Sequence, residues 1–148
     1  MTRNRSMSAK NILLQATMAV SLGLFTVGFA AASPTDDILA GYATEASALD
    51  SSFDGFSAER GRTLFVTEFG TGKEDTPACT TCHTNDPTQL GETRAGKSID
   101  PMAASINLER YFELKQVEKW FGRNCKSVIG RECTPIEKGD FITFMLTL

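Results

Sequence analysis

The feature that most constrains this chain is the sequence Cys-Thr-Thr-Cys-His at residues 79–83. Its two thiols lie three positions apart, so both can add to the vinyl groups of one haem while the adjoining imidazole lies beneath the iron. The competing interpretation is a disulfide or half of a zinc site. Zinc needs further ligands, but His83 is the only histidine, and Cys125 and Cys133 lie more than forty residues away. The motif therefore predicts one haem c, bound covalently by Cys79 and Cys82 and ligated by His83.

Residues 1–32 have the three parts of a secretory signal peptide. Basic residues occur in the first ten positions, an apolar run covers residues 12–29, and three alanines precede Ser33. The alternative is an uncleaved membrane anchor, but glycine and polar residues interrupt the run, and the small-residue site follows directly. We expect a signal peptide at 1–32, export to the periplasm, and one mature domain at 33–148.

The charge of the chain limits its partners. The formal net charge is −3, and removing the three basic residues of the signal segment takes it to −6. An acidic protein is a poor match for nucleic acid. The net charge predicts no nucleic-acid partner and a docking partner that presents basic residues. A domain of this size is expected to be a monomer.

The two cysteines outside the haem motif form an even pair. Cys125 and Cys133 are separated by seven residues that include Gly130. In an exported protein such a pair is expected to form a disulfide. A closed loop this short stabilises the fold by about 2–3 kcal/mol on the loop-entropy model. Redox activity of the disulfide, coupled to the haem, is the alternative role.

The mature chain has the pattern of helices and loops, with little that indicates a strand. Apolar residues at helical spacing predict a helix over Asp36–Leu49, and Ser57 is a good N-cap for a second helix that leads into the haem motif. Residues 85–100 are rich in turn-forming residues and predict a loop around the haem edge. A third helix is expected from about Glu113, and Thr134 begins the last one with a proline and a capping-box glutamate.

The sequence leaves the ligand on the second face of the iron open. With His83 as the sole histidine, a second histidine ligand within one chain is excluded. The remaining candidates are Met102, Met145, Lys119, Asn124 or water. Methionine is the usual partner in electron-transfer cytochromes, because its soft thioether stabilises reduced iron. Met102 follows a proline in a loop, so it is a realistic ligand.

Asn124 is the other strong candidate, because of its place in the helical pattern. It follows Val117, Trp120 and Phe121 by seven, four and three residues, so a continuing helix would bury its carboxamide on the apolar face. A buried amide needs a partner, and the iron is one. The alternative is that Asn124 ends the helix, a position that asparagine favours.

Several further motifs follow the haem site at characteristic spacings. They are Cys79-Thr-Thr-Cys-His83-Thr-Asn-Asp-Pro, Gly96-Lys97, Pro101-Met102-Ala103, Lys119-Trp120-Phe121, Arg123-Asn124-Cys125, Gly130, Cys133-Thr-Pro and Glu137-Lys138-Gly139-Asp140-Phe141. Together they resemble the sphaeroides haem protein (SHP)-like monohaem cytochromes c over nearly the whole mature chain. The related methylotroph cytochrome c double-prime is similar, but has histidine where this chain has Asn124.

The resemblance implies an all-α chain, with a small class I-like cytochrome c fold and extended loops around one covalent haem. It implies that Asn124 ligates the oxidised iron and leaves on reduction, which opens a site for O₂, NO or CO. A role as nitric oxide dioxygenase or oxygen reductase is implied, with a dihaem cytochrome c as electron donor, itself served by a membrane b-type cytochrome. The alternative is a plain electron-transfer cytochrome with Met102 as the sixth ligand.

Overall fold

The computed structural model describes residues 31–148, and the predicted signal peptide lies almost entirely outside them. The fold is all-α, as predicted, with one very small hairpin. Its elements are α1 (Pro34–Leu49), α2 (Ala58–Val66), α3 (Thr80–His83), β1 (Gly91–Glu92), β2 (Ser98–Ile99), the 3₁₀-helix η1 (Leu108–Tyr111), α4 (Leu114–Val128) and α5 (Pro135–Leu146). Among the described residues, no helix is both long enough and apolar enough to cross a membrane.

The first and last helices begin with the same capping device. At α5, the Thr134 side chain accepts from the Glu137 N–H while the Glu137 side chain accepts from the Thr134 N–H. Ser33 and Asp36 form the equivalent capping box at α1. A cap of this kind stabilises a helix by about 1 kcal/mol. The predicted start of α5 is confirmed, whereas α1 begins at Pro34, two residues before the predicted start.

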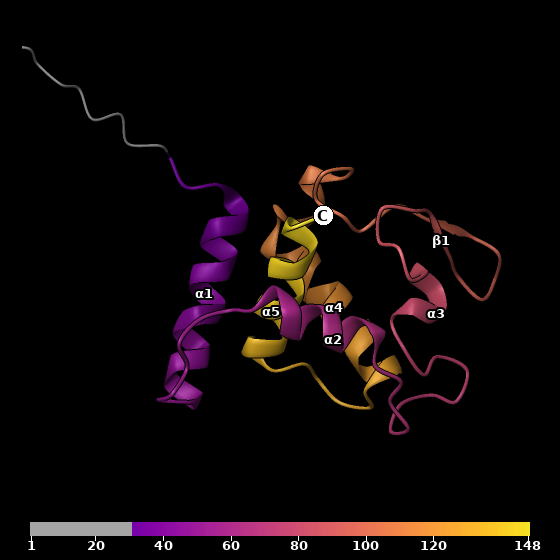
Figure 1. The fold of residues 1–148 in the computed structure, drawn as a ribbon, viewed down its shortest axis with the longest axis horizontal. Helices are drawn as coiled ribbons and strands as arrows, with labels where there is room; N and C mark the ends of the chain where they lie inside the picture. The colour runs from indigo at the N-terminus through magenta and orange to yellow at the C-terminus, as the bar shows by residue number, and fades with distance from the viewer. Residues whose placement is uncertain (1–30) are drawn as a thin grey trace, which may run out of the picture. The chain divides into compact units, whose positions relative to one another are not determined.

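The core lies where α2, α4 and α5 meet. Its largest fully buried side chains are Phe65, Ile142 and Met145. Phe65 packs against Phe141 with ring centroids 6.1 Å apart, and Phe121 of α4 meets Phe141 edge-on at 5.5 Å. Figure 1 shows these three helices grouped between α1 on one side and α3 with the hairpin on the other. The aromatic core therefore fixes α4, on which Asn124 lies, relative to α2 and α5.

Helices α2 and α5 approach each other closely at Gly61. A Cβ on Gly61 would overlap the Asp140 carbonyl oxygen and lie 2.9 Å from the Phe144 Cβ. Beside this contact, Arg60 forms an ion pair with the buried Asp140 at 2.7 Å, and the Ser57 N–H donates to the same carboxylate at 2.6 Å. The Ser57 N–H and two N–H groups of the Arg60 guanidinium thus satisfy the Asp140 carboxylate, which burial would otherwise destabilise.

Candidate functional site

The predicted haem motif forms a single helical turn. Cys79 precedes α3, and its carbonyl oxygen accepts from the His83 N–H at 3.1 Å. Residues three positions apart lie on the same side of a helical turn, which places the Cys79 and Cys82 side chains together. Both thiols are free in the structure. The local backbone thus has the arrangement that two thioether bonds to one haem require.

Thr84 ends this turn in a backbone conformation that is rare for its residue type. It has φ 59° and ψ 174°, a region that glycine alone adopts readily, at a cost of about 1–3 kcal/mol. Its hydroxyl donates to the Asp86 carbonyl at 2.8 Å and accepts from the Asp86 N–H at 3.2 Å. This local bonding holds the chain as it turns away directly after His83.

The hairpin that follows packs on the haem motif through a glycine. Gly91 of β1 pairs with Ile99 of β2. A Cβ on Gly91 would overlap the Cys82 carbonyl oxygen and lie 3.2 Å from the His83 Cα. Only glycine lets β1 come this close to α3 without a shift. Gly91 therefore positions the hairpin against the two residues that carry the sulfur and the imidazole.

Hydrogen bonds hold the backbone at and before Met102 from several sides. Its N–H donates to the Pro87 carbonyl at 2.8 Å, and the Tyr111 hydroxyl donates to the Met102 carbonyl at 2.8 Å. The Arg110 guanidinium also donates to the two preceding carbonyls, those of Asp100 and Pro101, at 3.3 and 3.4 Å. Pro87 belongs to the loop that leaves His83, so these bonds connect the Met102 backbone to that loop and to η1.

A cavity brings the predicted ligands together. Cys79, Cys82, His83, Met102 and Asn124 all contribute to its wall. Its apolar lining includes Leu64, Ala78, Val117, Trp120, Phe121, Val128, Ile129 and Phe141, and its basic lining residues are Arg94, Arg110 and Arg123. A haem has a flat apolar ring and two anionic propionates, so apolar walls with arginines fit it. No periodic pattern in the sequence indicates Arg110 or Arg123 as lining residues.

Burial sets the protonation of the haem-motif residues. Burial, together with the positive charge of Arg110, lowers the pKa of His83 to about 4. His83 is therefore neutral at pH 7, the form in which an imidazole ligates a metal. Burial also raises the pKa of the Cys79 thiol to about 11. A half-buried neutral imidazole beside two half-buried thiols suits a haem-iron ligand.

Asn124 lies within α4, which continues to Val128, so it does not end the helix. The expectation that its carboxamide is buried on the apolar face is wrong: Asn124 is exposed and borders the cavity. The buried stripe of α4 instead runs through Val117, Phe121 and Cys125. Among residues 31–148, no hydrogen bond joins the Asn124 side chain to another residue, and Asn124 borders the cavity.

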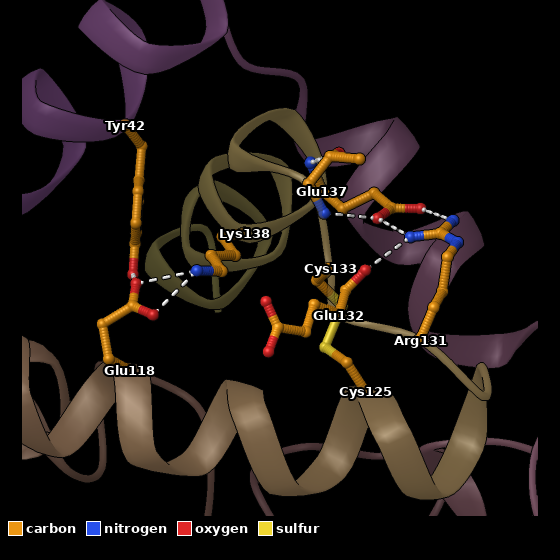
Figure 2. The surroundings of a disulfide bond; sticks show 9 residues. Tyr42, Glu118, Cys125, Arg131, Glu132, Cys133, Glu137 and Lys138 are labelled. Atoms are coloured by element: carbon orange, nitrogen blue, oxygen red, sulfur yellow. Dashed lines mark hydrogen bonds and ion pairs between the residues drawn. A yellow bond between two sulfur atoms is a disulfide. The ribbon is translucent and has the colours of Figure 1, made fainter.

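A disulfide holds the backbone next to Asn124. It joins Cys125 of α4 to Cys133, with the two Cα atoms 5.6 Å apart. Within the closed loop, Arg131 forms an ion pair with Glu137 of α5 at 2.7 Å (Figure 2). The disulfide and the ion pair together tie the C-terminal half of α4 to the start of α5.

Two of the other candidate iron ligands lie away from the cavity. Met145 is fully buried in the core, and Lys119 places its Nζ 5.6 Å from the centroid of the Trp120 ring. Neither contributes to the cavity wall. In the part of the chain that the structure describes, no three His, Cys, Asp or Glu residues gather as a metal-ion site. Met102 and Asn124 remain as the protein candidates.

Comparisons with known proteins show the family to which this chain belongs. Residues 51–145 match a family described as a domain of unknown function, DUF1924. The chain is 54% identical over 88 residues to the cytochrome c-type protein SHP of Cereibacter sphaeroides, which covers 60% of this chain and 68% of that protein. This chain belongs to the SHP-like family of cytochromes c. It is also 36% identical over 88 residues to cytochrome c″ of Methylophilus methylotrophus, across 59% of this chain and 61% of that protein.

Solved structures of this SHP-like family share the fold. Oxidised SHP, described as an oxygen-binding cytochrome c, matches with a TM-score of 0.72 at 45% identity, over 78% of this chain and 98% of that one. Oxidised cytochrome c″ from Methylophilus methylotrophus matches with a TM-score of 0.69 at 30% identity, over 77% of this chain and 94% of that one. As an SHP-like cytochrome c, the protein binds haem c covalently, and the cavity wall fits that group.

Proposed function

We propose that this protein carries one haem c, bound through Cys79 and Cys82, with His83 and Asn124 as axial ligands of the oxidised iron. Haem c supplies a redox-active iron that takes up O₂, NO or CO when a coordination position is free. In the proposed cycle, Asn124 would hold the oxidised iron and would release it on reduction. The protein is thus a redox-gated receptor for diatomic gases in the periplasm, acting as a monomer.

The observation that carries this proposal is the position of Asn124 on the wall of the cavity that also holds Cys79, Cys82 and His83. Met102 also borders the cavity, but its backbone is bonded to Pro87 in the loop that leaves His83. The two axial ligands of a haem approach from opposite faces. Asn124 lies on α4, an element separate from the loop that leaves His83, so it is the better candidate for the second ligand.

The chemistry of the carboxamide favours release on reduction. Its oxygen is a hard ligand that suits ferric iron and holds the softer ferrous ion poorly. Val117 and Phe121 line the cavity with apolar surface, which favours small uncharged gases over water. The relatives support this direction: SHP is described as oxygen-binding, and a solution study of cytochrome c″ concerns haem-ligand detachment.

The proposed physiological role is that of a nitric oxide dioxygenase or an oxygen reductase. In the first case, one NO, one O₂ and one electron give one nitrate ion. The electron would come from a dihaem cytochrome c, itself reduced by a membrane b-type cytochrome. Such a role needs no nucleophile or general base from the protein, because the iron supplies the reactive centre.

Optical spectra of the purified holo-protein test the gating. We expect a low-spin oxidised spectrum, and a high-spin reduced spectrum that shifts at once when CO is added. Asn124→Ala should alter the oxidised spectrum and leave CO uptake intact. Met102→Leu, which removes the thioether at similar volume, should change neither.

The alternative is a plain electron carrier with Met102 as sixth ligand. The position of Met102 on the cavity wall is the observation that favours it. A low-spin reduced spectrum that ignores CO, and that Met102→Leu abolishes, would establish this carrier and rule out Asn124 gating.

A further inference from the structure

One side of α4 carries a row of positive charges that runs from solvent to the edge of the cavity. Lys115, Lys119 and Arg123 follow one another at four-residue spacing, so they lie on the same side of the helix. All three are exposed, and among residues 31–148 none forms an ion pair. We call these three residues the basic row. Lys126 continues it by one turn, but is paired with Glu132 at 3.0 Å.

The acidic residue of α4 is engaged elsewhere. Glu118 accepts from the Lys138 Nζ at 2.8 and 2.9 Å and from the Tyr42 hydroxyl. Figure 2 shows Lys138 of α5 reaching this carboxylate from one side and Tyr42 of α1 from another. Glu118 therefore joins three helices and does not neutralise the basic row. The row stands out on a chain whose formal net charge is −3.

Trp120 connects the basic row to the haem cavity. Its ring lies 5.6 Å from the Lys119 Nζ and 5.3 Å from the Arg123 Cζ. Trp120 and Arg123 both contribute to the cavity wall, and the Trp120 ring is 42% exposed. Tryptophan and arginine are the residues that most often anchor protein interfaces. The positive surface thus reaches the edge of the cavity where the haem binds.

We propose that the basic row, with Trp120, docks the acidic face of an electron-transfer protein. The bound partner passes one electron to the oxidised haem iron, so the partner is oxidised and the iron reduced by one electron. This inference uses only the location of the haem and does not depend on Asn124 gating. It reverses the expectation from net charge that the partner is basic, because the local charge beside the haem governs docking.

A redox protein fits this surface better than an anionic membrane does. The row borders the cavity, so a partner bound there would lie close to the haem, which favours electron transfer. The rest of the chain is acidic, with eighteen Asp and Glu residues in total, and a broad anionic surface would repel it. A compact acidic patch contacts the row and avoids that repulsion.

Stopped-flow reduction of the oxidised holo-protein tests the proposal, with reduced flavodoxin as the acidic electron-transfer probe. For the wild-type protein, we expect the second-order rate constant to fall as ionic strength rises. Lys119→Glu should lower that constant by about 5- to 10-fold at low ionic strength, with the difference shrinking at high salt. Arg62→Glu, an exposed charge reversal on α2 outside the cavity wall, is the matched control and should change it by less than about 2-fold.

Equal losses in Lys119→Glu and Arg62→Glu would overturn the proposal, since net charge alone would then explain them. So would a wild-type rate constant that rises with ionic strength. Sedimentation with phosphatidylglycerol vesicles tests the membrane interpretation, and vesicle binding lost in Lys119→Glu with an unchanged flavodoxin rate would favour it. CO uptake by reduced Lys119→Glu should match wild type, so a failure of gas binding is distinguishable from a failure of docking.

Discussion

Substituting Gly61 by alanine should destabilise the protein, although the same change at Gly41 should stabilise it. Both glycines lie inside helices, Gly61 in α2 and Gly41 in α1. A Cβ on Gly41 meets no atom within 4 Å, whereas a Cβ on Gly61 overlaps the backbone carbonyl of Asp140. Helix propensity alone favours alanine at both sites by about 1 kcal/mol. At Gly61, the contact with α5 outweighs this gain, so the substitution lowers the free energy of unfolding.

The magnitude follows from what must move. The overlapping atoms belong to the α5 backbone, which cannot rotate away as a side chain can, so the cost is at the upper end of the 1–3 kcal/mol of overpacking, or about 3 kcal/mol. After the propensity gain, Gly61→Ala should lose about 2 kcal/mol and Gly41→Ala should gain up to about 1 kcal/mol. For a domain of this size, 1 kcal/mol corresponds to about 4 °C in Tm.

Thermal unfolding of the two holo-proteins, followed by circular dichroism and by haem absorbance, measures the difference. We expect Gly61→Ala to melt about 8 °C below wild type and Gly41→Ala up to about 4 °C above it. A Gly61→Ala protein that melts at or above wild type would refute the close α2–α5 crossing.

Three further predictions concern the haem side of the fold and the last helix. Gly91→Ala should separate the hairpin from Cys82 and alter the oxidised haem spectrum, whereas Gly70→Ala, where a Cβ meets nothing within 4 Å, should leave the spectrum unchanged. Tyr111→Phe should cost about 1 kcal/mol in denaturant unfolding, because it removes the buried bond to the Met102 carbonyl. The hydrogen bond from Arg131 holds the pKa of Glu137 below its ordinary 4.5, so the stabilisation is present above pH 4.5 and is lost as pH falls further. Acid titration of stability should therefore show a smaller loss below pH 4.5 in Glu137→Gln than in wild type.

The sequence predicted the longer helices because their signals are local. The last helix was predicted with its correct first turn, since Thr134 and Glu137 form a recognisable capping box. The α3 turn and the β1–β2 hairpin were not predicted as elements. A four-residue helix and two-residue strands are too short to show any periodicity. Their positions depend on contacts between separate segments, such as that of Gly91 with Cys82. No local sequence pattern indicates such contacts.

The candidate site was predictable where chemistry fixes the spacing. Cys79, Cys82 and His83 must be adjacent for one haem, and the structure brings all three to one cavity. The exposure of Asn124 could not be predicted, because a helical pattern shows which residues share a face and not which part of that face is covered. Arg110 borders the cavity only because η1 folds back over the loop before Met102.

The contrast between Met102 and Asn124 bears on how a ligand can leave and return. A detachable ligand needs a side chain with no competing bonds and a backbone that stays in place. Asn124 meets both conditions in the described residues: its carboxamide forms no hydrogen bond there, and its neighbour Cys125 is tied to Cys133. Met102 is buried, with its N–H and carbonyl both bonded, which suits a residue that supports the site. Reduction of the disulfide should therefore weaken the rebinding of Asn124 to the oxidised iron more than it weakens ligation by His83.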